Sequence, residues 1–159
     1  MHYLVSLIVE ADDKEEANVQ AETVMIDLIN LQELDWYQTR TDDSNLSGCW
    51  EPILLSDQKA RTMVHETMQS QYEYFKQDIA TIRFMLENYT DEQIFNENFG
   101  QHNNRFYLSR YQFSRASGCH TNESQIYDSN GDAITNYRSL EAYINDPAKL
   151  WLVRVNCHN

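Results

Sequence analysis

The fold is first indicated by residues 3–31, YLVSLIVEADDKEEANVQAETVMIDLINL. Residues 3–10 alternate and are rich in Leu, Val and Ile, which predicts a strand with at least one buried face. Asp12 or Asp13 then caps a helix, and an acidic first turn complements the positive end of the helix dipole. One side of this helix is predicted to be buried and the other to be polar. The buried positions are Ala17, Ala21, Val24, Leu28 and Leu31, and the polar positions are Glu15, Asn18 and Glu22.

Residues 33–39 predict a second strand and complete an N-terminal β-α-β unit. The polar stretch 41–48 predicts an exposed loop. Residues 49–55 predict a short strand, which Pro52 restricts to an edge or an irregular segment.

A long amphipathic helix is predicted to begin at Ser56 or Asp57. Its apolar positions recur at steps of three and four, close to a seven-residue repeat. We interpret this stripe as core, and the alternative is that part of it forms a homodimer seam. Thr90 and Gln93 predict a capping box on a short companion helix that ends at Gly100. The stripe consists of Val64, Met68, Tyr72, Phe75, Ile79, Ile82, Leu86 and Tyr89.

The C-terminal half is predicted to be rich in strands. Residues 105–114 predict a strand, and the turn 128–132, which contains Asn-Gly, predicts a hairpin between residues 125–127 and 133–137. Residues 139–145 predict a helix closed by Pro147, and residues 149–157 predict a final strand with Trp151, Val153, Val155 and Cys157 on one face. The order predicts a single α+β domain, residues 1–159, with a mainly antiparallel sheet.

The net charge of −13 is unevenly distributed. Residues 1–57 hold 13 Asp and Glu against only Lys14 and Arg40, whereas the remaining residues are almost balanced. This acidity disfavours contact with nucleic acid or anionic membrane and favours a basic protein partner. A solvated surface that promotes solubility explains the same charge equally well.

The composition predicts a soluble protein of the cytoplasm. We find no signal peptide and no apolar run of the roughly 20 residues needed to span a bilayer. Three cysteines without framework spacing favour a reducing compartment.

The cysteines and histidines offer weak candidates for chemistry. Zinc accepts these ligand types, and the candidates are Cys49, His102, Cys119, His120, Cys157 and His158. Neighbours on a strand point to opposite faces, however, so one Cys-His pair rarely supplies two ligands. A nucleophilic Cys119 or Ser117, with His120 or His102 as base, lacks an identifiable orienting group and oxyanion hole. We expect no metal, no cofactor and no catalytic residues.

Three segments carry a resemblance: Leu34-Asp35-Trp36-Tyr37-Gln38, Ser47-Gly48-Cys49-Trp50 and the end Leu152-Val153-Arg154-Val155-Asn156-Cys157-His158. The chain resembles a loose group of small, uncharacterised bacteriophage and plasmid proteins. Those proteins have a Gly-Gly-Arg-Trp turn that is absent here, and Asn156 stands where Asp is usual. The resemblance implies an origin in a mobile element and no established activity.

Two functions from different classes are expected. The first is a non-catalytic acidic binding protein, an anti-CRISPR-like inhibitor that occupies the basic groove of a host defence nuclease by mimicry of nucleic acid or by blocking. Its partner-binding residues are Asp12, Asp13, Glu15, Glu16, Glu22, Asp35, Trp36, Tyr37, Asp42 and Asp43. The alternative is a small enzyme or a protein that binds a small anionic ligand or nucleotide. That function uses His102, Arg105, Arg110, Arg115, Cys119 and His120.

Overall fold

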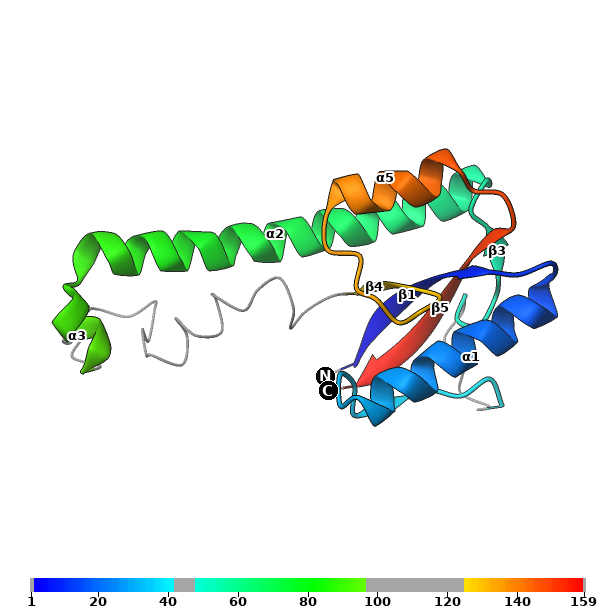
Figure 1. Cartoon of the computed structure of the whole chain (residues 1–159), viewed down its shortest axis with the longest axis horizontal. Helices are drawn as coiled ribbons and strands as arrows, with labels where there is room; N and C mark the ends of the chain where they lie inside the picture. Colours follow the sequence, from blue (N-terminus) through cyan, green and yellow to red (C-terminus); the bar gives the residue numbers. More distant parts are fainter. Residues whose placement is uncertain (1, 42–47, 97–124, 159) are drawn as a thin grey trace. The chain divides into compact units, whose positions relative to one another are not determined.

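The computed structural model describes residues 2–41, 48–96 and 125–158. It confirms an α+β fold with a mixed five-stranded sheet (Figure 1). The predicted strand 105–114 lies outside the described residues. The elements are β1 (His2–Glu10), α1 (Lys14–Asn30), β2 (Trp36–Tyr37), β3 (Ile53–Leu54), α2 (Gln58–Asn88), α3 (Asp91–Phe95), β4 (Ile126–Asp128), α5 (Tyr137–Asn145) and β5 (Leu150–His158).

The chain divides into two compact units, one of residues 1–70 and 124–159 and the other of residues 71–123. All five strands belong to the first unit. The prediction of a single domain is not tested by this division and stays a prediction.

The sheet has the strand order β2-β5-β1-β4, and β3 also pairs with β5. Strand β5 is antiparallel to β1, β2 and β3, whereas β4 is parallel to β1. The predicted mainly antiparallel sheet is therefore confirmed. The β1-α1-β2 unit also forms, but β5 is inserted between its two strands.

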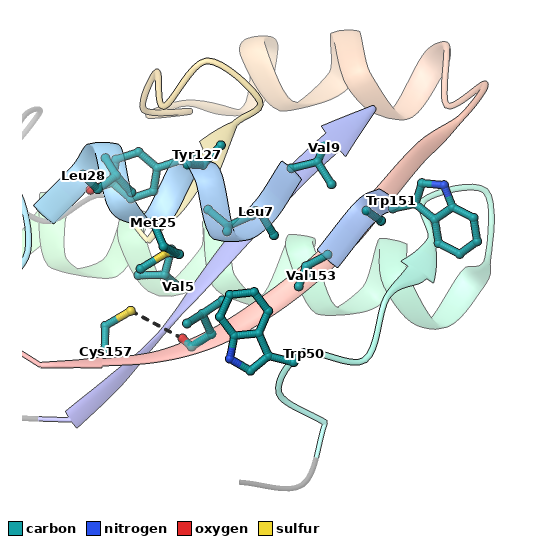
Figure 2. Packing of buried hydrophobic residues seen from close by; sticks show 14 of the residues in the cluster. Val5, Leu7, Val9, Met25, Leu28, Trp50, Tyr127, Trp151, Val153 and Cys157 are labelled. Atoms are coloured by element: carbon teal, nitrogen blue, oxygen red, sulfur yellow. Dashed lines mark hydrogen bonds between the residues drawn. The ribbon is translucent and has the colours of Figure 1, made fainter. Parts of the chain in front are cut away.

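One face of the sheet packs against α1. The odd-numbered residues of β1 and β5 point to this face, and Leu7 and Val153 are completely buried there. Figure 2 shows these side chains beneath Met25 and Leu28 of α1, with Tyr127 and Trp50 beside them. The predicted buried face of the last strand is confirmed, because Trp151, Val153, Val155 and Cys157 all belong to this core.

Two predictions about α1 are wrong. Leu31 is 70% exposed, because the helix ends at Asn30 and Gln32 adopts a φ of 60°, which turns the chain away from the buried face. Asn18 is buried instead of polar and exposed, since the face that contacts the sheet is wider than the predicted stripe. Met25 lies in the same widened face and is fully buried.

The other face of the sheet packs against α5 and the beginning of α2. Ile8 and Leu152 contact this second core, together with Val64 and Met68 of α2 and Leu140 of α5. Figure 1 shows α5 beside the first part of α2. The core interpretation of the long stripe is therefore confirmed for its first two positions.

The later part of the stripe lies in the second unit. Tyr89 is buried there with Met85 and contacts Ile94 of α3, whereas Tyr72 and Leu86 are exposed. The homodimer seam stays a prediction. The capping box of Thr90 and Gln93 is confirmed, but α3 ends at Phe95, before the predicted end at residue 100.

The predicted turn at residues 128–132 forms around one carboxylate. Asp128 Oδ1 accepts hydrogen bonds from the backbone N–H groups of Asn130 and Asp132, and Gly131 adopts the left-handed region with a φ of 79°. The second arm of the predicted hairpin is reduced to one bridge between Tyr127 and Ala133. It ends early because Asn136 caps α5.

Leu28 of α1 and Leu31, which follows the end of the helix, test this arrangement. We expect Leu28→Ala, at a side chain only 1% exposed, to lower the free energy of unfolding by about 2–5 kcal/mol, since it leaves a cavity. The matched Leu31→Ala should change it by less than about 0.5 kcal/mol. Urea denaturation measures both, and equal losses would contradict the assigned end of α1.

Candidate functional site

Four of the predicted carboxylates gather at the N-terminus of α1. Asp13 is the N-cap, and its Oδ1 accepts a hydrogen bond of 2.9 Å from the Glu16 backbone N–H. Glu16 Oε2 in turn accepts one of 2.6 Å from the Asp12 backbone N–H. These two carboxylates satisfy backbone donors that every helix start leaves free, so they have a local structural role.

The other two carboxylates pair with cations. Arg40 donates two hydrogen bonds of 2.9 Å to the two oxygens of Glu15, and Lys149 donates one to Asp12. The hydrogen bond to Asp12, then the charges of Asp12, Glu10 and Glu16, raise the pKa of Lys149. Exposed ion pairs of this kind contribute little to stability, so the cations of a partner can replace them at little cost.

The outer side of α1 carries an apolar ridge. Val19 and Ile26 lie two turns apart on the side opposite the sheet and are 49% and 48% exposed. Helical spacing places Glu15 and Glu22 along one flank of this ridge, and Glu16 and Asp27 along the other. We call these six residues the α1 outer surface: Glu15, Glu16, Val19, Glu22, Ile26 and Asp27.

The two predicted aromatic anchors lie on opposite faces of the sheet, since they are neighbours on β2. Tyr37 pairs with Cys157 and packs on the α1 side, with its ring centroid 6.2 Å from that of Trp50. Burial, and then the charge of Glu22, raise the pKa of Tyr37. Trp36 pairs with His158 on the other face. Only Tyr37 therefore lies on the face of the sheet that α1 covers, where the charge of Glu22 acts on it.

The remaining predicted acidic residues are placed in part. Asp35 is exposed just before β2. Asp42 and Asp43 lie outside the described residues. Val19, Ile26 and Asp27 were not among the predicted site residues, although their spacing on the exposed side of the predicted helix was a usable signal.

The candidates for metal binding and catalysis receive no new support. Within residues 2–41, 48–96 and 125–158, no three His, Cys, Asp or Glu side chains gather to hold a metal ion. Burial raises the pKa of Cys157 to about 12, and its Sγ contacts the Val155 carbonyl oxygen (Figure 2). Burial also raises the pKa of Cys49, despite the opposing charge of Arg154. His102, Arg105, Arg110, Arg115, Cys119 and His120 lie outside the described residues.

Among the described helices, none has the length and apolarity that a bilayer span requires. The first unit consists of a mixed sheet between two helical layers, and the helix on one side, α1, is acidic. The chain belongs to the family described as a domain of unknown function, DUF7995, whose model matches residues 1–159. No curated protein and no solved structure matches it.

The role of Asp13 as a cap is testable separately from its charge. Asp13→Ala should lower the free energy of unfolding by about 1 kcal/mol, because the Glu16 N–H loses its acceptor. Asp13→Asn keeps an acceptor oxygen and should retain most of that stability. Urea denaturation of both variants provides the measurement, and a harmless Asp13→Ala would argue against the cap.

Proposed function

We propose that this protein is a non-catalytic binding protein whose α1 outer surface docks on a basic surface of a partner protein. The observation that carries the proposal is the half-exposed ridge of Val19 and Ile26, framed by carboxylates on both sides. An apolar centre with a charged rim is the usual composition of a protein–protein contact.

Charge supports a basic protein as the partner. Residues 1–57 contain 13 Asp and Glu against two basic residues, so the field around α1 attracts cations and repels phosphate. Such a field accelerates association and excludes acidic competitors. The apolar ridge adds contact area whose contribution to affinity does not depend on salt concentration.

The kind of partner follows from the resemblance to bacteriophage and plasmid proteins. A host nuclease of a defence system has a basic groove for nucleic acid, and carboxylates on α1 offer it negative charge in place of phosphate. We propose inhibition of such a nuclease, in the host cytoplasm, by occupation of this groove. The carboxylates already paired with Arg40 and Lys149 exchange these cations for those of the groove.

Charge reversal tests the proposed surface. A variant with Glu15, Glu22, Asp27 and Asp35 changed to Lys spares the capping residues Asp13 and Glu16. We expect affinity capture from host lysate at low salt to recover a specific partner with the unaltered protein. The variant should lose at least about 100-fold in affinity, since several charge pairs become repulsive.

A matched control reverses four exposed carboxylates elsewhere, Glu51, Glu66, Glu87 and Glu141, and produces the same change in net charge. This control should retain binding. If both variants lose the partner equally, the acidity acts only as a diffuse field. If neither loses it, or if no partner is captured at any salt concentration, the surface is a solvated face and the proposal fails.

The ridge makes its own prediction. Val19→Ser combined with Ile26→Ser removes apolar contact and leaves every charge in place. Affinity for the captured partner should fall by about tenfold or more, with an unchanged dependence on salt concentration. Titration calorimetry at two salt concentrations measures this, and unchanged affinity would show that the ridge does not contact the partner.

A further inference from the structure

The sheet face opposite α1 changes from apolar to polar along its length. The even-numbered residues of β1 and β5 point to this face, where Ile8 lies opposite Leu152 in the core with α2 and α5. The next pair along the ladder is Ser6 and Arg154. Cross-strand partners have Cβ atoms only about 5 Å apart, so these two side chains leave the sheet beside each other on the same face.

Both side chains contain buried polar atoms without a partner. Ser6 is 1% exposed and its Oγ makes no hydrogen bond, and the same is true of the buried Nε of Arg154. Within the described residues, no carboxylate forms an ion pair with Arg154. A buried donor without a partner destabilises the fold, and it does so more strongly when the group is charged.

Hydrogen bonds from neighbouring segments hold the backbone of β5 at Arg154 and the side chain of Asn156 in place. The backbone N–H of Trp50 donates a 2.8 Å hydrogen bond to the Arg154 carbonyl oxygen. The indole N–H of the same residue donates one of 2.7 Å to the Gln38 carbonyl oxygen. Asn156, the next residue of β5 on this face, donates its side-chain N–H to Gln38 Oε1 at 3.2 Å. Gln38 and Asn156 are both buried.

The backbone of Trp50, which holds β5 at Arg154, is strained. Trp50 has a φ of 56°, in the left-handed region that bulky residues rarely adopt. Strain of this kind persists only where surrounding contacts enforce it, and it is concentrated at functional sites. The rigid backbone at Trp50 lies beside the Arg154 guanidinium, whose Nε has no partner, and such an arrangement suits the recognition of a ligand.

We propose that Arg154 and Ser6 bind a small oxyanion, either a carboxylate or a phosphate group. A guanidinium presents parallel N–H donors that match two oxygens of such an anion, and the serine hydroxyl supplies a further donor. The anion converts a lone, half-buried cation into a hydrogen-bonded pair. This site lies on the opposite face of the sheet from the α1 outer surface, so either proposal can fail without the other.

Titration with three defined anions tests the site. Thermal unfolding and calorimetry of the full chain are measured with sodium phosphate, adenosine monophosphate and sodium acetate, at an ionic strength kept constant with sodium chloride. We expect a saturable rise in Tm with at least one anion. A response to phosphate and adenosine monophosphate alone identifies a phosphate group, and a response to acetate identifies a carboxylate.

Three substitutions connect the response to this pair. Ser6→Ala should weaken binding about tenfold, since one hydrogen bond to a charged group is lost. Arg154→Lys keeps the charge but loses the paired donors and should weaken binding at least as much. Arg154→Met should abolish it, whereas Arg138→Met removes one exposed charge from α5 and should bind normally.

Two results would overturn the proposal. One is the absence of a saturable response to any of the three anions in the folded, unaltered protein. The other is a response that Ser6→Ala and Arg154→Lys both leave unchanged. Circular dichroism shows whether each variant folds. Because Ser6→Ala and Arg154→Lys alter few atoms, they test the proposed anion site even if Arg154→Met does not fold.

Discussion

The antiparallel ladder between β1 and β5 positions the rest of the first unit. Both strands are nine residues long and they pair from His2 with His158 to Glu10 with Leu150. Strands β2 and β3 share the outer edge of β5, and β4 adds to the outer edge of β1. Each helical layer packs on side chains that this ladder aims to one face or the other. The short strands are too small to pair stably by themselves, so they depend on the long pair.

The same alternation separates two kinds of surface. Odd-numbered residues support α1, whose outer side carries carboxylates, and even-numbered residues lead to Ser6 and Arg154 on the opposite face. A shift of one residue in the pairing would exchange the two sets of side chains and place Arg154 beneath α1. The core residues Val153, Val155 and Cys157 of β5 disfavour such a shift, because it would move all three out of the core that they share with α1.

Sequence periodicity predicted the elements that contact one another over long, regular stretches. The first strand, α1, the long helix and the last strand were all found, since their burial repeats many times. Local features that depend on a single contact were missed: Leu31 leaves the buried face where the helix ends, and the arm after Gly131 is cut short by the cap of α5.

The candidate surfaces follow the same rule. Carboxylates at the start of α1 were predicted, because capping chemistry is local. The separation of Trp36 from Tyr37 required knowledge of which residue of β2 faces α1. Arg154 and Ser6 are 148 positions apart in the sequence and meet only through the ladder. The one usable signal was the polar alternation of Arg154, Asn156 and His158 opposite an apolar face.

The position of β5 in the sheet also has a consequence for synthesis on the ribosome. The strand that joins β1 to β2 and β3 is translated after all of them, so β1 leaves the exit tunnel without its long partner. Until residues 150–158 emerge, β1 can pair only with the short β4, and the long edge that β5 occupies stays open. Nascent chains that stop before β5 therefore expose the unpaired edge of a hydrophobic strand, which favours aggregation and degradation.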